Sequence, residues 1–335
     1  MKAAIVDAPG ALRVDVVADP VAAEGEVVVA VKVSGVCATD LHIVAGEFIA
    51  RYPIIPGHEL AGDIVDVGRG VTDVRVGDRV TVDPSLFCGR CYFCRSNMGN
   101  HCLEWNGIGT TRPGGFAEFV AVPARNVYPL GVLDHQQGAF VEPLACVVYG
   151  MRRLQPRAGD EVLVIGAGPI GLLLIQALRR AGSGRVTVTD RRTERLEVAA
   201  RLGADVAVLA GADGVRQLRH GAPLGFDVIV DATGVASAIQ EHLGLAKPGG
   251  RILLFGVCAP EDRISLSPFE VYRKDLTLIG SFALCYTFNP ALMLLQSGAV
   301  DVRTLVTHTF GLDRCAEALE AVRGGGALKV QILPS

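Results

Sequence analysis

The pattern of apolar and polar positions changes once along the chain, between residues 144 and 160. Before this change, short valine-rich segments are separated by glycine, aspartate and proline, as at 1–7, 27–33, 62–67 and 78–82. Many short strands with glycine turns are typical of compact β domains of the barrel type. Residues 1 to about 144 therefore predict a β-rich, barrel-like domain.

The chain from residue 160 to about 283 has a different rhythm. Its apolar segments are continuous, which is typical of strands buried on both faces. Strands that alternate with helices predict a doubly wound parallel sheet, here of six strands. We expect a helix at 172–178 and a turn at 247–249, with strands at 162–165, 186–189, 226–231, 250–256 and 276–280. Beyond this region we expect helices near 290–297 and 313–322 and a last strand at 327–333.

The length of the chain indicates how many domains it forms, and its charge disfavours some binding partners. A chain of 335 residues is too long for one ordinary core and indicates two domains. The net charge of −3 gives no electrostatic case for binding nucleic acid or an anionic membrane. We find no signal peptide and no apolar run of the roughly 18 residues that a membrane span needs. Nine cysteines then indicate metal binding or catalysis before disulfides, and we expect a cytoplasmic protein.

A glycine motif follows the strand at 162–165 directly and opens the helix after it. Its first glycine allows a tight turn, its second lets a pyrophosphate approach the backbone, and its third lets the helix pack on the strand. The next strand ends in Asp190, which can accept hydrogen bonds from both hydroxyls of a ribose. This context predicts a dinucleotide site at Gly166, Ala167, Gly168, Pro169, Ile170 and Gly171.

The strongest local signal is the spacing of four cysteines. Two, two and seven residues separate consecutive members of the set, in a loop rich in polar residues. Four thiolates this close can surround one metal tetrahedrally and leave no open position, so we expect a structural zinc. Sulfur ligands alone are also compatible with an iron–sulfur cluster. The four residues are Cys88, Cys91, Cys94 and Cys102.

A second ligand set is expected around Gly57-His58-Glu59. A thiol lies upstream at Cys37 and another carboxylate downstream at Glu142. One thiolate, one imidazole and one or two carboxylates suit Zn²⁺, and fewer than four fixed side-chain ligands is typical of catalytic sites. Glu59 and Glu142 are both candidates for the carboxylate ligand. We expect Asp40 to fix the tautomer of His58.

In this order, these motifs resemble those of the zinc-containing medium-chain alcohol and polyol dehydrogenases, and the match covers nearly the whole chain. The family implies a β-rich catalytic domain of the chaperonin-10 (GroES) type at 1–144 and 284–335. It places the dinucleotide-binding Rossmann domain at 145–283. The glutamate at position 142 resembles the branch of sorbitol, threonine and related polyol dehydrogenases, because the liver alcohol dehydrogenases have a cysteine at this position. The motifs are Gly35-Val36-Cys37 through His42, Gly57-His58-Glu59, the four cysteines, Val141-Glu142-Pro143 and the glycine motif.

The resemblance assigns roles to individual residues. It implies that Glu59 binds zinc directly and that Glu142 binds it directly or through water. Thr39 would take the proton of the alcohol, and His42 would pass it to solvent through the cofactor ribose. The implied reaction transfers hydride between nicotinamide and a secondary alcohol or polyol, while zinc lowers the pKa of the hydroxyl.

Further cofactor contacts and the assembly state also follow from the resemblance. Lys329 matches a basic position that contacts pyrophosphate, although a solvated lysine at a strand end is an alternative. Relatives pair their Rossmann sheets edge to edge, so we expect a homotetramer or homodimer. The strand at 276–279 would be the exposed edge of the sheet that a second subunit covers. We also expect cofactor contacts from Thr233, Val257, Ser281 and Phe282.

We predict NAD rather than NADP as the cofactor. The carboxylate of Asp190 would repel a 2′-phosphate, which carries nearly two negative charges. Arg191, Arg192 and Arg195 favour the opposite choice, since arginines in this loop hold the phosphate of NADP. NADP enzymes usually replace the acidic residue as well, and here it is kept.

The substrate and two alternative functions remain open. Sorbitol dehydrogenases carry an Arg-Tyr pair that contacts substrate where this chain has Ala283 and Leu284, so a smaller or less hydroxylated substrate fits better than sorbitol. One alternative is a zinc-independent NADPH reductase of carbonyls or enones, which Cys37, His58 and Glu142 disfavour because such relatives lack ligands at these positions. The other is a non-enzymatic NAD-binding protein.

Overall fold

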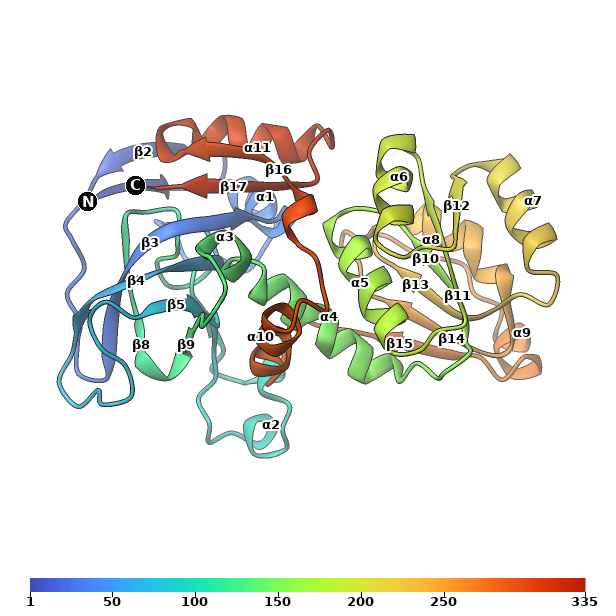
Figure 1. The fold of residues 1–335 in the computed structure, drawn as a ribbon, viewed down its shortest axis with the longest axis horizontal. Helices are drawn as coiled ribbons and strands as arrows, with labels where there is room; N and C mark the ends of the chain where they lie inside the picture. The colour runs from blue at the N-terminus through green and yellow to red at the C-terminus, as the bar shows by residue number, and fades with distance from the viewer. Residues whose placement is uncertain (335) are drawn as a thin grey trace. The chain divides into compact units, whose positions relative to one another are not determined.

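The computed structural model describes residues 1–334, which form two compact units. Unit 1 combines Met1–Ala145 with the chain from Leu284 onward, and unit 2 is Cys146–Ala283. Unit 1 is therefore built from two stretches that are far apart in sequence. Figure 1 shows this directly, because elements from the blue and the red end of the chain share one sheet.

The main sheet of unit 1 has the order β16-β17-β3-β4-β5-β9, and β8 also pairs with β3. The C-terminal strand β17 (Lys329–Leu333) lies antiparallel to β3 (Glu26–Val36), and β3 lies antiparallel to β4 (Glu59–Val67). This pairing brings both halves of unit 1 together at the end of β3. The other strands are β5 (Arg79–Val82), β8 (Phe119–Pro123), β9 (Val127–Pro129) and β16 (Val306–Gly311).

Alternation along β3 explains the core of this sheet. Val27, Val29 and Val31 are fully buried and pack with Leu60 and Ile64 of β4. Alternate residues of a strand point to the same face, and β-branched side chains pack well there. The expected strands are found, although β4 begins at Glu59 instead of 62. The edge strand β16 was not predicted, because it has no alternation of apolar residues and is mostly exposed.

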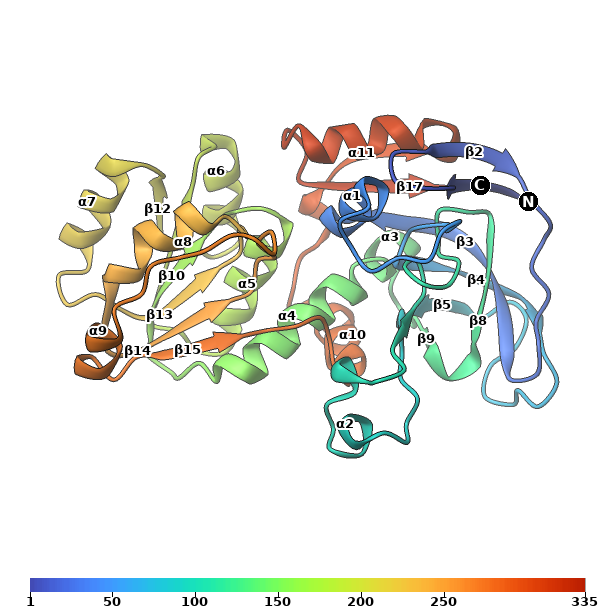
Figure 2. The ribbon, with the colours of Figure 1, turned by 180° about the vertical axis from the view of Figure 1, so that it is seen from behind.

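Short elements complete unit 1. Figure 2 shows α1 (Ala38–Ala45) beside α11 (Cys315–Arg323), with which it is in contact. The expected helices near 290–297 and 313–322 are α10 and α11, each displaced by about two residues. The remaining elements are β1 (Lys2–Val6), β2 (Leu12–Val16), β6 (Ser85–Leu86), β7 (Asn106–Gly107), α2 (Tyr92–Arg95), α3 (His135–Gly138) and α10 (Phe288–Gln296). The longer helix α4 (Val141–Leu154) begins in unit 1 and continues into unit 2.

Unit 2 contains the doubly wound parallel sheet that the sequence predicts. Its order is β12-β11-β10-β13-β14-β15, and every pair is parallel. Strand order therefore reverses beside β10, the position at which such folds bind dinucleotides. The elements are β10 (Glu161–Ile165), α5 (Pro169–Arg180), β11 (Arg185–Asp190), α6 (Thr193–Arg201), β12 (Val206–Leu209), α7 (Ala212–Gly221), β13 (Phe226–Asp231), α8 (Ala236–His242), β14 (Ala246–Leu254), α9 (Pro268–Arg273) and β15 (Thr277–Gly280).

Two details of unit 2 differ from the prediction. The expected turn at 247–249 lies inside β14 as a bulge: Ala246 pairs with Phe226 and Arg251 with Val228, so the residues between Ala246 and Arg251 are skipped in the pairing with β13. A bulge of this kind absorbs a Pro-Gly pair without ending the strand. Strand β12 was not located in the sequence, because only Val208 of its four residues is buried.

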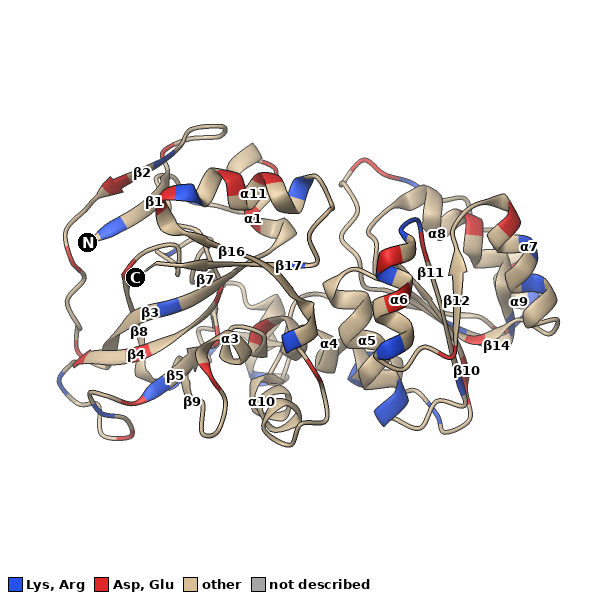
Figure 3. Cartoon of the chain, turned by 45° about the horizontal axis from the view of Figure 1, so that its top comes forward, with Lys and Arg blue, Asp and Glu red and all other residues tan. Residues whose placement is uncertain are grey.

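Charged side chains lie mainly on helices and loops. Figure 3 shows acidic and basic residues together on α6, α7 and α11, while the strands are largely uncharged. Within residues 1–334, no helix is long and apolar enough to cross a membrane.

Candidate functional site

The first candidate ligand, Cys37, lies where β3 ends and α1 begins. It is the residue that caps α1, and its backbone N–H donates to Asp40 Oδ2 over 2.8 Å. Asp40 is completely buried, so this bond fixes the start of the helix in the interior of unit 1. The Cys37 thiol faces Thr39, with 3.6 Å between Sγ and Oγ1.

His58 is positioned by the same carboxylate. Its Nδ1 lies 3.4 Å from Asp40 Oδ1, which also accepts from the N–H of Gly57 over 3.3 Å. Gly57 has a φ of 93°, and a β-carbon there would lie 2.5 Å from Phe116 Cδ1. The turn before His58 therefore needs a glycine. With Nδ1 toward Asp40, Nε2 is the nitrogen that would be left for a metal. Burial opposes charge on the ring, but Asp40 outweighs burial and raises the pKa of His58 well above its ordinary value.

Glu59 is the first residue of β4 and is 1% exposed. It pairs with Gly35 of β3, and Lys329 reaches it from β17, the strand on the other side of β3. The Lys329 ammonium contacts Glu59 Oε2 in a buried ion pair. Burial opposes the charge of Lys329, but Glu59 and then Cys37 outweigh it, so the pKa of Lys329 is raised. The alternative of a solvated strand-end lysine is wrong, since Lys329 is 4% exposed.

Cys37, His58 and Glu59 form one cluster. One ligand atom from each lies within 4.8 Å of the other two. Thiolate, imidazole and carboxylate are together suited to Zn²⁺, and three protein ligands leave a position for water or substrate. Glu142 lies in the first turn of α4, 9% exposed and outside this cluster, although its charge acts on Lys329. The geometry therefore favours Glu59 over Glu142 as the carboxylate ligand.

The two predicted relay residues both lie on α1. Thr39 is partly exposed beside Cys37, and His42 follows it by three residues, so both side chains are on one face of the helix. His42 Nδ1 lies 2.9 Å from Glu47 Oε2, and its side chain is 43% exposed. Thr39 is thus the residue next to the cluster, and His42 the residue next to solvent.

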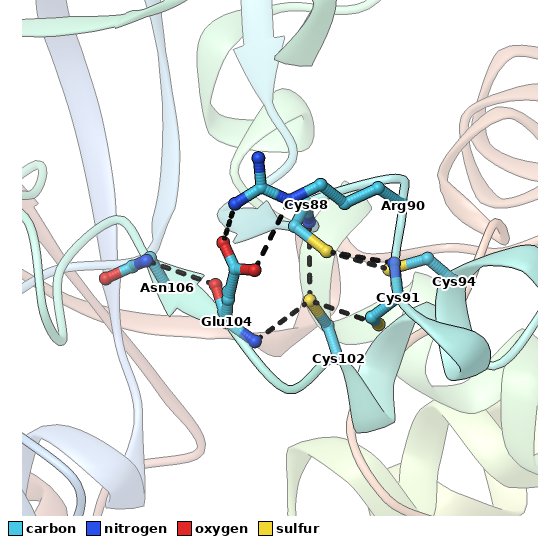
Figure 4. A network of polar contacts seen from close by, with 7 residues as sticks. All are labelled: Cys88, Arg90, Cys91, Cys94, Cys102, Glu104 and Asn106. Atoms are coloured by element: carbon cyan, nitrogen blue, oxygen red, sulfur yellow. Dashed lines mark hydrogen bonds and ion pairs between the residues drawn. The ribbon is translucent and has the colours of Figure 1, made fainter.

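The four expected cysteines lie together in a lobe around α2. Their sulfur atoms all lie within 4.8 Å of one another, and the four thiols are free. Sγ of Cys88 lies 3.9 Å from that of Cys94, and Sγ of Cys91 lies 4.0 Å from that of Cys102 (Figure 4). Tetrahedral ligands about 2.3 Å from a zinc ion are roughly 3.8 Å apart, so the lobe fits such an ion without rearrangement.

Backbone N–H groups stabilise the thiolates of this lobe. The N–H groups of Cys94 and Leu103 lower the pKa of Cys91 to about 6, and those of Arg90 and Cys91 lower the pKa of Cys88. Burial instead raises the pKa of Cys94 to about 12, so a metal would have to displace its proton. An exposed ion pair between Arg90 and Glu104 closes the loop over the sulfurs (Figure 4).

The segment that follows Ala283 supports the lobe instead of offering polar groups to a substrate. Leu284 is 1% exposed, and the Cys285 thiol donates to the carbonyl of Asn97 over 3.6 Å. Tyr286 packs edge-on against Phe87, with 5.5 Å between ring centroids. The positions at which sorbitol dehydrogenases carry an Arg-Tyr pair are therefore apolar here, and the second of them, Leu284, is buried.

In unit 2, the glycine motif has the spacing that a phosphate needs. Gly166 has a φ of 97°, and a β-carbon there would lie 2.7 Å from Thr233. A β-carbon on Gly171 would lie 1.9 Å from the carbonyl of Gly166, so α5 packs tightly on the turn. At Gly168, by contrast, the nearest group is Arg195 Nη1 at 3.8 Å. The N-terminus of α5 is thus open to an anion at its second glycine.

Asp190 ends β11 beside this turn and is itself held by the backbone. Its Oδ2 accepts from Ala167 N–H over 2.8 Å, and its Oδ1 accepts from Arg192 N–H over 2.9 Å. Arg192 pairs with Glu194, and Arg191 is exposed. Asp190 therefore has a structural role in addition to the predicted one.

A second aspartate of this kind was missed from the sequence. Asp231 ends β13, and its Oδ1 accepts from the N–H and hydroxyl of Thr233 over 2.9 and 2.6 Å. Its backbone carbonyl accepts from Phe255 and Gly256 N–H. Asp231 thus joins the two loops that carry Thr233 and the exposed Val257. An acid after a buried strand, as at Asp190, was the available signal.

The sequence matches two families over most of its length. Residues 23–132 match the alcohol dehydrogenase GroES-like domain, and residues 169–297 match the zinc-binding dehydrogenases. D-arabinitol dehydrogenase 1 of Uromyces fabae is 37% identical over 321 residues, which are 94% of this chain and 92% of the relative. The chain belongs to the zinc-containing medium-chain alcohol and polyol dehydrogenases. It is therefore an oxidoreductase that acts on a small molecule, as the sequence predicts.

Solved structures of this family superpose closely on the chain. A zinc-binding dehydrogenase from Sinorhizobium meliloti 1021 bound to NADP has a TM-score of 0.96 and 33% identity, and the match covers 99% of both chains. The rspB alcohol dehydrogenase of E. coli CFT073, complexed with NADH, has a TM-score of 0.93 at 33% identity, and this match also covers 99% of both chains. The predicted Rossmann and GroES-like folds are thereby confirmed.

Proposed function

We propose that the protein is a zinc-dependent dehydrogenase that transfers hydride between NAD and a secondary alcohol or polyol. The observation that carries this proposal is the cluster of Cys37, His58 and Glu59, whose ligand atoms lie within 4.8 Å of one another. A zinc ion held there would act as a Lewis acid toward the substrate oxygen. Glu142 lies outside the cluster and would act through its negative charge.

The residues around the cluster have distinct roles in this proposal. Asp40 holds His58 through Nδ1 and so fixes which nitrogen faces the metal. The Thr39 hydroxyl, which lies beside Cys37, would accept the proton that the substrate hydroxyl loses and release its own proton toward the cofactor ribose and His42. His42 carries that proton to solvent, to which its ring is exposed.

The cofactor assignment depends on unit 2. The open N-terminus of α5 at Gly168 would bind the pyrophosphate, and Asp190 would bind the adenosine ribose. The related structure bound to NADP supports the opposite choice, whereas the one with NADH supports NAD. Arg191, Arg192 and Arg195 follow Asp190 in the chain and would permit some use of NADP. We keep NAD as the preferred cofactor because the carboxylate of Asp190 opposes a 2′-phosphate. Thr233, Val257, Ser281, Phe282 and Lys329 remain our candidates for further cofactor contacts.

A polyol or a secondary alcohol other than sorbitol is the proposed substrate class. The relative that oxidises D-arabinitol supports a polyol. Leu284 is buried, and neither it nor Ala283 has a polar side chain that could bind substrate hydroxyls. We therefore expect recognition of fewer hydroxyl groups than in sorbitol dehydrogenases.

The remaining features are consistent with a cytoplasmic oligomer. The four-cysteine lobe would hold a structural zinc, since it has no open position. Nine free thiols suit a reducing compartment. The edge strand β15 would pair with a second copy in a homodimer or homotetramer.

A substrate panel with metal analysis tests this proposal. Polyols, secondary alcohols, amino alcohols and cyclitols would each be supplied with NAD or NADP, and formation of the reduced cofactor followed by absorbance. We expect metal-dependent turnover of at least one polyol or secondary alcohol with NAD. Turnover that survives complete removal of metal would contradict the proposal, as would reduction of enones alone.

A further inference from the structure

The buried ion pair of Glu59 and Lys329 crosses a strand. Glu59 is on β4 and Lys329 is on β17, and β3 runs between these two strands. Their side chains meet because the residue of β3 at this point is Gly35. A β-carbon on Gly35 would lie 2.1 Å from Glu59 Oε2 and 3.0 Å from Lys329 Cε. Gly35 thus leaves the space that the pair occupies.

We propose that Lys329 is the positioning residue of the metal ligand Glu59, which it holds in the cluster by one carboxylate oxygen across Gly35. This inference rests on the proposed function, because it assumes that Glu59 binds a metal. It gives Lys329 a role apart from the predicted contact with pyrophosphate.

Burial makes the loss of one partner of this pair more costly than in an ordinary, exposed lysine–carboxylate pair. The side chains of Lys329 and Glu59 are 6% and 2% exposed, whereas those of the pair Lys2–Asp313 are 41% and 71% exposed. Exposed pairs contribute little to stability, but removing one partner of a buried pair leaves an uncompensated charge. Without Lys329, Glu59 Oε2 would lose the ammonium group that it contacts, and the carboxylate could turn away from the cluster. That movement would remove a ligand from the cluster.

The contact also specifies which part of Glu59 is available to a metal. Lys329 contacts Oε2, and Glu59 still offers an oxygen within 4.8 Å of the ligand atoms of Cys37 and His58. Partners of metal ligands fix ligand orientation in this way, and their loss typically lowers metal affinity by about 10- to 100-fold. Lys329 acts on the carboxylate as Asp40 acts on His58.

Two different substitutions should break the same pair. Lys329→Met removes the charge and keeps the length of the side chain. Gly35→Ala keeps both charges but fills the space between them. Lys329→Arg retains a cation and should recover most of the lost function. Lys2→Met is the matched control, because it removes a lysine whose partner lies at the surface.

The readout is the affinity of the purified full-length protein for zinc, measured by competition with a chelator, together with the absorption spectrum of the cobalt-substituted protein. We expect Lys329→Met and Gly35→Ala each to lower the affinity of one zinc per chain by about 10- to 100-fold and to change the cobalt spectrum. Lys2→Met should leave both unchanged. In a Glu59→Gln background, Lys329→Met should add little, because the group that it positions is gone.

Several results would overturn the inference. Zinc binding that is unchanged or tighter in Lys329→Met would show that Lys329 does not hold Glu59 in place for the metal. An equal loss with and without Glu59 would show that Lys329 acts by another route. If the wild type binds zinc only at the four cysteines, the proposed function fails instead. Non-additive effects of Lys329→Met and Glu59→Gln on thermal unfolding would then still establish the ion pair, and additive effects would refute it.

Discussion

Asp40 lies 3.4 Å from His58 through Oδ1, and through Oδ2 it accepts the backbone N–H of Cys37. One completely buried carboxylate therefore places two ligands of the candidate metal cluster. Its two oxygens therefore connect the backbone of Cys37 to the ring of His58.

Replacing Asp40 should weaken the metal site more than the fold. Asp40→Asn keeps the shape but cannot balance the charge of the His58 ring or accept through both atoms. We expect metal affinity and kcat/KM to fall by about 10- to 100-fold. Chelator competition and steady-state kinetics measure the two effects. Asp63→Asn is the control, since Asp63 contacts His135 over 2.8 Å outside the cluster. Equal effects of the two substitutions would count against a special role for Asp40.

The four-cysteine lobe should matter for stability first. Cys88→Ser removes one ligand of a site that has no open position, so binding energy that contributes to folding is lost. We expect the variant to lose one zinc per chain and to unfold several degrees lower in a thermal scan. Cys258→Ser, in a loop of unit 2, should change neither quantity. Normal thermal stability of Cys88→Ser would refute the structural assignment.

Cofactor choice should depend on the charge of Asp190. Its oxygens accept from Ala167 and Arg192 N–H, so Asn is a better replacement than Ala because it leaves an acceptor in place. We expect Asp190→Asn to shift the ratio of kcat/KM for NAD over NADP toward NADP by about 10-fold or more, which is roughly 1.4 kcal/mol. Kinetics with both cofactors measure this shift. A wild type that prefers NADP, or a ratio that does not move, would show that another residue discriminates.

Asp83 should make stability depend on pH. Burial raises its pKa to about 7, although the N–H of Ser85 donates to it. The folded protein then binds a proton that the unfolded chain has already released above about pH 4. Stability should therefore fall as the pH rises from about 4 to 7, by up to roughly 4 kcal/mol.

The variant Asp83→Asn isolates this effect, because an amide cannot ionise. We expect its thermal midpoint to exceed that of the wild type at pH 8 and to approach it at pH 4. Asp73→Asn, in an exposed loop, controls for the general loss of an acidic side chain. A difference between Asp83→Asn and the wild type that is the same at both pH values would contradict the prediction.

Local patterns in the sequence were enough to predict much of this protein. The glycine motif with Asp190 and the four cysteines each occupy a short segment, and the structure places both as expected. The contact of Lys329 with Glu59 could not be predicted, because the two residues are 270 positions apart and meet only through the pairing of β17 with β3. The choice between Glu59 and Glu142 likewise needed the positions of β4 and α4.

The most direct test of the proposed catalytic zinc site is the zinc content of the wild type and of Cys37→Ser, measured on proteins that were purified in the same way. Cys37, His58 and Glu59 form a cluster separate from the four cysteines. We therefore expect two zinc ions per chain in the wild type and one in Cys37→Ser, with NAD-dependent oxidation abolished and thermal stability largely kept. The same zinc content in both proteins, or full turnover by Cys37→Ser, would contradict this expectation.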